Sequence, residues 1–190
     1  MTIQTLNPII IKSMDEIEGD FDRNQHIHHA IQTINNSIGW TDYSHDLEFI
    51  FEWAKDFYDR SFIAYCQEEP IGYLVCTDLP EKEPKDSYFK KDLPHYSYIA
   101  YLAVRSDYQG QGIGTALMEE TMFTVVALGK MYLCLHCHPN KEGFYLNFAA
   151  SEQSCNLPIT GTSEVIDIQY EDGDSIHYVV YNLEGEERAI

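Results

Sequence analysis

Basic residues are scarce in this chain of 190 residues. Lysine and arginine together number 12, against 31 aspartates and glutamates, so the formal net charge is −19 at pH 7. Such a surface repels nucleic-acid phosphates and anionic membranes, because proteins bind both mainly through clustered cations. We therefore expect neither nucleic acid nor a membrane as a partner. The charge favours a cationic small molecule or a basic protein segment.

Long hydrophobic runs and regular cysteine spacing are also lacking. No window approaches the roughly 18 apolar residues of a membrane span. The N-terminal stretch MTIQTLNPIIIKSMDE has neither the basic nor the apolar region of a secretory signal. The five cysteines are odd in number and irregularly spaced, which does not indicate a disulfide framework. We therefore expect a reduced, cytoplasmic protein.

Apolar spacing predicts strands and helices in one chain without a repeat or an obvious linker. Pro70 falls near the turn of a predicted hairpin, and Asp172-Gly173 marks the turn of another. Strands are expected at 8–14, within 61–79, at 96–104, at 131–137 and within 163–183, and helices at 22–40, 43–60, 112–130 and 141–153. The order predicts one mixed α/β domain spanning residues 1–190.

A glycine-rich loop separates the predicted strand ending "LAV" from the helix that follows. Gly110, Gly112 and Gly114 fall on alternate residues there. Loops of this kind bind phosphate, because bare backbone N–H groups and a helix N-terminus can approach an anion closely. A P-loop would need a lysine after the glycines, and none is present. A dinucleotide fingerprint would place its third glycine at Thr115 and an acidic residue after the next strand, so that motif is a poor match.

The pattern that remains is Q-x-x-G-x-G, formed by Gln109, Gly112 and Gly114. The stretch YLAVRSDYQGQGIGTALMEE around it resembles the central motif of the GNAT superfamily of acyl-CoA-dependent N-acetyltransferases. The resemblance is strongest from about residue 61 to residue 150. It implies a GNAT-like fold, which is a single mixed, mostly antiparallel sheet flanked by helices. It also implies acetyl-CoA as co-substrate and no metal.

The resemblance also implies which residues contact coenzyme A. In the family, the backbone of the strand before the loop contacts the pantetheine arm and polarises the thioester, and the matching positions are Leu102 and Val104. Asn140 is a further expected contact. The loop itself would wrap the pyrophosphate with Gln109, Gly110, Gln111, Gly112, Ile113, Gly114 and Thr115.

Acetyl transfer to an amine requires a proton donor for the thiolate and a proton acceptor for the amine. By resemblance, Tyr145 in the "FY" pair is expected to be the donor, since the ordinary pKa values of a phenol and a thiol differ by only about one to two units. The family often places a carboxylate at strand positions that hold Tyr98 and Ala100 here. The identity of the group that accepts the proton of the amine therefore stays open. The candidates are water, Tyr98 and a nearby histidine, His136 or His138.

The segment "CLHCHP" has residue types that bind metals. On a strand, however, Cys134 and Cys137 point to opposite faces, because their offset is odd. No second pair lies at zinc-site spacing, so we expect no metal site.

Carboxylates along the second predicted helix favour a cationic acceptor, although a solvated helix face explains them equally well. They are Glu48, Glu52, Asp56 and Asp59. Two functions follow. One is transfer of an acetyl group from acetyl-CoA to a primary amine by direct attack in a ternary complex. The other is a non-catalytic acyl-CoA-binding sensor or interaction domain. A homodimer is an assembly that the sequence leaves open.

Overall fold

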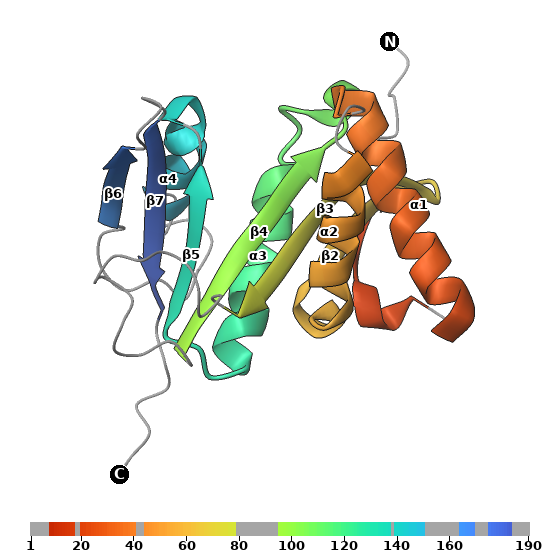
Figure 1. Ribbon diagram of the computed structural model, residues 1–190, viewed down its shortest axis with the longest axis horizontal. Coiled ribbons are helices and arrows are strands. Elements are labelled where there is room, and N and C mark those ends of the chain that lie inside the picture. The colour runs from red at the N-terminus through yellow and green to blue at the C-terminus, as the bar shows by residue number, and fades with distance from the viewer. Residues whose placement is uncertain are drawn as a thin grey trace. The chain divides into compact units, whose positions relative to one another are not determined.

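A computed structural model describes residues 8–17, 20–40, 44–78, 95–137, 139–150, 164–169 and 175–183. Most of the loop expected at 79–95, His138 and the Asp172-Gly173 turn lie outside these residues. The strands are β1 (Ile9–Ser13), β2 (Phe62–Cys66), β3 (Glu69–Asp78), β4 (Tyr96–Val104), β5 (Tyr132–Cys137), β6 (Glu164–Gln169) and β7 (Ser175–Asn182). The helices are α1 (Asp20–Ile38), α2 (Ser44–Lys55), α3 (Ile113–Ala127) and α4 (Glu142–Ala150) (Figure 1).

The strands form a seven-stranded sheet in the order β1-β2-β3-β4-β5-β7-β6. Strand β5 pairs parallel with β4 and antiparallel with β7. The pairs β1–β2, β2–β3 and β6–β7 are also antiparallel. The prediction of a mixed, mostly antiparallel sheet flanked by helices is confirmed.

The chain divides into two compact units. The first unit comprises Met1–Val75 and Tyr101–Met118, and the second comprises Cys76–Ala100 and Glu119–Ile190. Strands β3 and β4 and helix α3 each contribute residues to both units.

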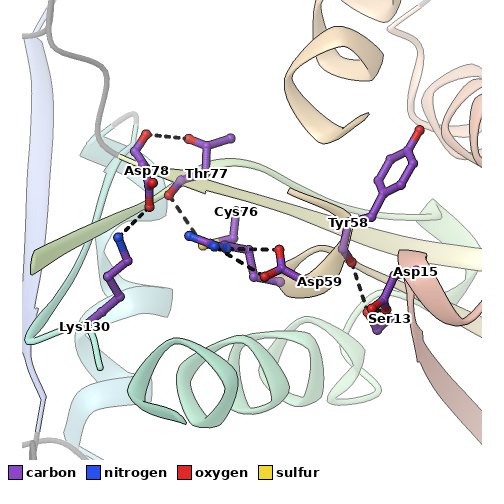
Figure 2. A network of polar contacts seen from close by, with 9 residues as sticks. Ser13, Asp15, Tyr58, Asp59, Cys76, Thr77, Asp78 and Lys130 are labelled. Carbon is purple, nitrogen blue, oxygen red and sulfur yellow. Dashed lines mark hydrogen bonds and ion pairs between the residues drawn. The ribbon is translucent and has the colours of Figure 1, made fainter. Parts of the chain in front are cut away.

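In the first unit, helix α1 buries the apolar face that its spacing predicts. Ile27, Ile31 and Ile34 are fully buried, as are Ile50 and Ala54 of α2. Before α1, the Ser13 hydroxyl donates to the Tyr58 carbonyl oxygen at 3.0 Å (Figure 2). Burial of these aliphatic side chains supplies the main stabilisation of this helical layer.

The predicted hairpin of β2 and β3 is present, and its turn lies close to Pro70, as expected. Gln67 and Glu68 form the turn with φ angles of 50° and 70°, whereas Pro70 lies within β3 opposite Tyr65. A two-residue hairpin turn of this twist needs positive φ at both central residues. Proline cannot supply positive φ because its ring fixes φ near −65°.

A buried hydrogen bond joins β3 to α1. The Tyr73 hydroxyl donates to Asn35 Oδ1 at 2.8 Å, and both side chains are buried. Burial raises the pKa of the Tyr73 phenol well above its ordinary value. This phenol therefore stays neutral in the folded protein at pH values where it ionises in the unfolded chain.

We expect Tyr73→Phe to lower the free energy of unfolding at pH 7 by about 1–3 kcal/mol, because Asn35 loses its buried partner. At pH 11 the loss of unfolding free energy caused by the substitution should be smaller by about 1.4 kcal/mol. Tyr73 stabilises the wild type fully below its unfolded pKa of about 10, and that contribution is lost as the pH rises further. Urea denaturation of both proteins at pH 7 and pH 11 measures the difference. An equal cost at both pH values would contradict the buried, neutral phenol.

In the second unit, β5 is hydrogen-bonded along both edges. Its parallel pairing with β4 runs from Tyr96 opposite Tyr132 to Ile99 opposite Leu135. Helix α4 packs on β7 (Figure 1). The rings of Phe148 and Tyr181 meet there edge to face, with their centres 6.0 Å apart. Strand β5 is therefore held rigidly in place, which fixes the directions of its side chains.

Gly129 caps the C-terminus of helix α3, as predicted. Gly129 has a φ of +75°, its N–H donates to the Val126 carbonyl, and the Lys130 N–H donates to the Val125 carbonyl. This pair of bonds is a Schellman cap, which favours glycine at the left-handed position. The Lys130 ammonium then reaches the Asp78 carboxylate at 2.6 Å, as Figure 2 shows.

Candidate active site

The glycine loop of the first unit presents backbone N–H groups at the start of α3. Gly110 and Gly112 have φ angles of +75° and +82°, and the first helical hydrogen bond runs from Ala116 N to Gly112 O at 2.9 Å. Within the described part of the chain, no N–H group from Gln109 to Thr115 bonds to another backbone group. Successive N–H groups at a helix N-terminus favour an anion. The loop has the chemistry of a phosphate site.

The side chains of the two loop glutamines bind carbonyl oxygens that precede them in the chain. Gln109 Nε2 donates to the Val104 carbonyl oxygen at 2.9 Å, and Gln111 Nε2 donates to the Asp107 carbonyl oxygen at 3.1 Å. These amides hold the backbone in its turned conformation. Both residues still offer their own N–H groups to an anion.

Arg105 anchors the loop to β3, a role that the sequence did not predict. Its N–H donates to the Ile71 carbonyl oxygen at 2.8 Å. Its guanidinium binds both carboxylate oxygens of Asp107, at 3.1 and 2.8 Å, and one of Glu69, at 3.1 Å. It also lies over the Tyr108 ring, 5.1 Å from the ring centre. A local signal did exist, because the spacing of Arg105 and Asp107 suits an ion pair across a turn.

Leu102 and Val104 occupy alternate positions of β4, and both are half-buried. Next to them, Gly72 of β3 allows a close approach. A Cβ atom at Gly72 would lie 3.2 Å from both the Ala103 carbonyl oxygen and Ile113 Cγ2. The absence of a side chain at Gly72 thus lets the first turn of α3 pack closely on the sheet.

In the second unit, two of the three open candidates for proton acceptor come together. The Tyr98 hydroxyl is hydrogen-bonded to His136 Nδ1, and the two ring centres are 5.6 Å apart. Tyr98 is 2% exposed, whereas His136 is exposed at the end of β5. Tyr98 lies opposite Cys134 in the parallel pairing, so His136, two residues on, shares its face.

Tyr145 lies in the first turns of α4. Burial raises the pKa of its phenol to about 12, and the neighbouring Cys137 thiol adds to the rise. The pKa of this phenol therefore differs from that of an ordinary thiol by more than the one to two units expected from unperturbed values. The Tyr181 hydroxyl donates to the Tyr145 carbonyl oxygen at 3.0 Å and holds this part of α4 on β7. Asn140 is exposed in the short 3₁₀ turn that precedes α4.

The cysteines of β5 are buried. Burial raises the pKa of the Cys134 and Cys137 thiols, which disfavours the thiolates that metals bind. Among the described residues, no three His, Cys, Asp or Glu side chains lie close enough together to hold a metal ion. No helix of the described segments has the length and apolar character needed to cross a membrane.

Solved structures with a similar fold include three acetyltransferases or their complexes. The structure described as the NatC complex bound to Gag peptide and CoA has a TM-score of 0.60 and 18% identity, with 92% of this chain and 98% of that chain covered. Diaminobutyrate acetyltransferase EctA from Paenibacillus lautus, in complex with its substrate L-2,4-diaminobutyric acid and coenzyme A, has a TM-score of 0.63 and 14% identity, with coverage of 95% and 98%. YncA from Salmonella typhimurium, a putative acetyltransferase with its cofactor acetyl-CoA, has a TM-score of 0.58 and 13% identity, with coverage of 97% and 98%.

No curated protein sequence matches the chain significantly. The profile of the acetyltransferase (GNAT) family matches residues 24–148, which is more than half of the chain. The match includes the glycine loop, the Tyr98–His136 pair and Tyr145. The chain belongs to the GNAT family of acetyltransferases.

Proposed function

We propose that the protein, acting as one domain over residues 1–190, transfers an acetyl group from acetyl-CoA to a primary amine. The observation that carries the proposal is the row of backbone N–H groups from Gln109 to Thr115 at the start of α3. In a chain of net charge −19, an anionic cofactor must be held by local donors of this kind. Similar structures hold coenzyme A or acetyl-CoA, which supports this choice of cofactor.

The proposed cofactor contacts divide by chemistry. The N–H groups of Gln109, Gly110, Gln111, Gly112, Ile113, Gly114 and Thr115 would bind the pyrophosphate. The main chain of Leu102 and Val104 would contact the pantetheine arm and polarise the thioester carbonyl. Asn140 would add a contact from its exposed position before α4.

The proposed reaction is direct attack of the amine on the thioester in a ternary complex. Tyr145 would donate a proton or a strong hydrogen bond to the departing thiolate, since its phenol stays neutral up to high pH. Tyr98 would belong to the path that removes the proton of the amine. Both assignments use general acid and base chemistry, which typically contributes about 10²–10⁴-fold to a rate.

The proposed acceptor is cationic, either a small molecule or a basic protein segment. Glu48 and Glu52 are exposed along α2, and Asp59 is exposed in the turn that follows α2. These carboxylates and the overall charge attract a cation toward the protein. The acetyltransferase EctA, whose described substrate is a diamino acid, is consistent with such an acceptor.

Two measurements test the proposal. Isothermal titration with acetyl-CoA should detect binding, and a thiol-release assay over a panel of amines should show turnover. We expect a higher kcat/KM with diamines and polyamines than with a monoamine that carries no second charge. This difference in kcat/KM should fall as the salt concentration rises. Binding without thiol release from any amine would favour an acyl-CoA sensor or interaction domain. Absence of binding would contradict both functions.

A further inference from the structure

We infer that Arg105 sets the affinity of the glycine loop for its anionic cofactor by neutralising two carboxylates beside the loop, Asp107 and Glu69, and that it does so without contacting the cofactor. This inference rests on the proposed function and adds a positioning residue to the cofactor site. Every residue that carries it belongs to the first unit.

Arg105 is the cation that the sequence places beside the glycine loop. No lysine or arginine occurs between Arg105 and Lys130, a stretch that holds the whole loop and helix α3. Asp107 stands near the start of this stretch, and its Cα atom lies within about 7.6 Å of that of Gln109, because only two residues separate them. The loop must therefore bind an anion through its backbone N–H groups while a carboxylate lies close to the first of them.

The guanidinium of Arg105 is directed at carboxylates. Its Nε and Nη2 atoms donate to the two oxygens of Asp107, at 3.1 and 2.8 Å, and Nη1 donates to Glu69 Oε2 at 3.1 Å. This fork-shaped contact to one carboxylate, together with a second carboxylate on the third nitrogen, needs the planar group of arginine. All three nitrogens bind a carboxylate, so the arrangement is one of charge neutralisation.

Stability does not account for this cluster of ion pairs. The side chains of Glu69 and Asp107 are 67% and 56% exposed, whereas that of Arg105 is 20% exposed. Ion pairs that reach water contribute little to the free energy of unfolding. The same carboxylates lie beside a loop with the chemistry of a phosphate site, where each negative charge that is not neutralised opposes the binding of an anion. The cluster therefore matters more for affinity than for folding.

Arg105 also holds the Asp107 carboxylate away from the loop. The Tyr108 N–H donates to the Arg105 carbonyl oxygen at 3.0 Å, and the Asp107 carbonyl oxygen accepts from Gln111 Nε2 at 3.1 Å. The backbone of Asp107 thus supports the loop while its carboxylate is bound to the guanidinium. Without Arg105, this carboxylate would be a competing acceptor for the N–H groups that we propose bind the pyrophosphate, since carboxylates favour helix N-termini.

The first measurement is the affinity of the full-length protein for acetyl-CoA by isothermal titration in 0.1 M salt. In Arg105→Met the affinity should fall about tenfold, as expected for one added charge about 8 Å from a doubly charged pyrophosphate at an effective dielectric constant of about 60. In 1 M salt the loss should be about twofold, because the Debye length falls from about 10 Å to about 3 Å. Arg105→Lys keeps the charge and should lose less than about threefold.

Arg60 provides a matched control for Arg105. Its Nε and Nη2 atoms donate to the two oxygens of Asp59, at 3.2 and 3.3 Å, and its guanidinium lies over the Phe57 ring, 5.2 Å from the ring centre. Arg60 precedes β2, whereas Glu69 lies at the other end of that strand, about 13 Å farther along it. Arg60→Met changes the net charge by the same amount beyond the Debye length, so the affinity should change less than about twofold.

The decisive variant combines Arg105→Met with Asp107→Asn and Glu69→Gln. It removes the cation together with both carboxylates and leaves the Asp107 carbonyl oxygen available to Gln111. If Arg105 acts by neutralisation, this variant should bind acetyl-CoA at least as tightly as the wild type. If Arg105 instead contacted the cofactor, the variant would stay as weak as Arg105→Met.

An NMR titration of the Asp107 carboxyl carbon reports on the ion pair without any cofactor. The hydrogen bond from Arg105 lowers the pKa of Asp107. The carboxyl should therefore titrate below its ordinary value of about 3.9 in the wild type and close to that value in Arg105→Met.

Two results would overturn the inference while the proposed function stands. One is a loss of affinity in Arg105→Met no larger than in Arg60→Met, and the other is a combined variant that stays as weak as Arg105→Met. A wild-type protein that binds no acetyl-CoA would refute the proposed function and this inference together. The NMR titration would then still show whether Arg105 and Asp107 are paired in solution.

Discussion

Replacing Gly112 by aspartate is expected to lower the affinity for acetyl-CoA about 150-fold. A carboxylate would then lie beside the N–H groups that we propose bind the pyrophosphate. Two unit charges about 5 Å apart repel by about 3 kcal/mol at an effective dielectric constant of about 20. Tenfold in affinity corresponds to about 1.4 kcal/mol. A Cβ atom at Gly112 meets no atom within 4 Å, so the new side chain fits without a clash. Isothermal titration at low and high salt measures the loss, and salt should reduce it.

Gly39 provides a matched control for this substitution. It has the same φ of +82°, ends α1, and also has no atom within 4 Å of an added Cβ. Aspartate tolerates the left-handed region better than most residues, so both variants should lose a similar, small amount of stability. Only Gly112→Asp should lose affinity for acetyl-CoA. A comparable loss of affinity in Gly39→Asp would show that the effect is global and not specific to the loop.

The loop was predictable from the sequence because its signals are local. Glycine at positive φ, a strand before the loop and a helix after it are all encoded in adjacent residues, and the structure has Gly110 and Gly112 in that conformation. The buried face of α1 was predictable for the same reason, since Ile27, Ile31 and Ile34 recur at the helical period.

What the sequence left open depends on pairing between distant segments. Arg105 reaches Glu69, which is 36 residues away in the chain, and only the packing of β4 on β3 brings them together. The Tyr98–His136 pair likewise depends on the register between β4 and β5.

Burial is the other quantity that the sequence did not supply, and it changes the chemistry expected of Tyr145. An ordinary phenol has a pKa of about 10, but burial raises that of Tyr145 to about 12. Transfer of its proton to a fully solvated thiolate would be unfavourable. A thiolate released into the same buried surroundings also has a raised pKa, because low polarity disfavours both anions. In the proposed site the pKa values of the two groups would therefore be matched even though their solution values differ.

Tyr145→Phe is expected to lower kcat for thiol release on the order of 10³-fold. The variant removes only the phenolic hydroxyl, and the hydrogen bond from Tyr181 is kept because it ends on the Tyr145 carbonyl. Acetyl-CoA binding should therefore persist, which titration can confirm. Tyr65→Phe is the control, since Tyr65 is another half-buried tyrosine whose pKa is raised by burial. It should leave kcat unchanged.

The pH dependence separates this role from a structural one. Because the Tyr145 phenol keeps its proton up to a pH near 12, wild-type kcat should show no alkaline decline from this group between pH 7 and pH 10. An unperturbed phenol would already be half ionised at about pH 10, so half of the enzyme molecules would lack the proton to donate there. Unchanged turnover in Tyr145→Phe would refute the assignment of Tyr145 as the donor. A decline in wild-type kcat at pH 9–10 that disappears in Tyr145→Phe would instead show that the phenol is solvated when it acts.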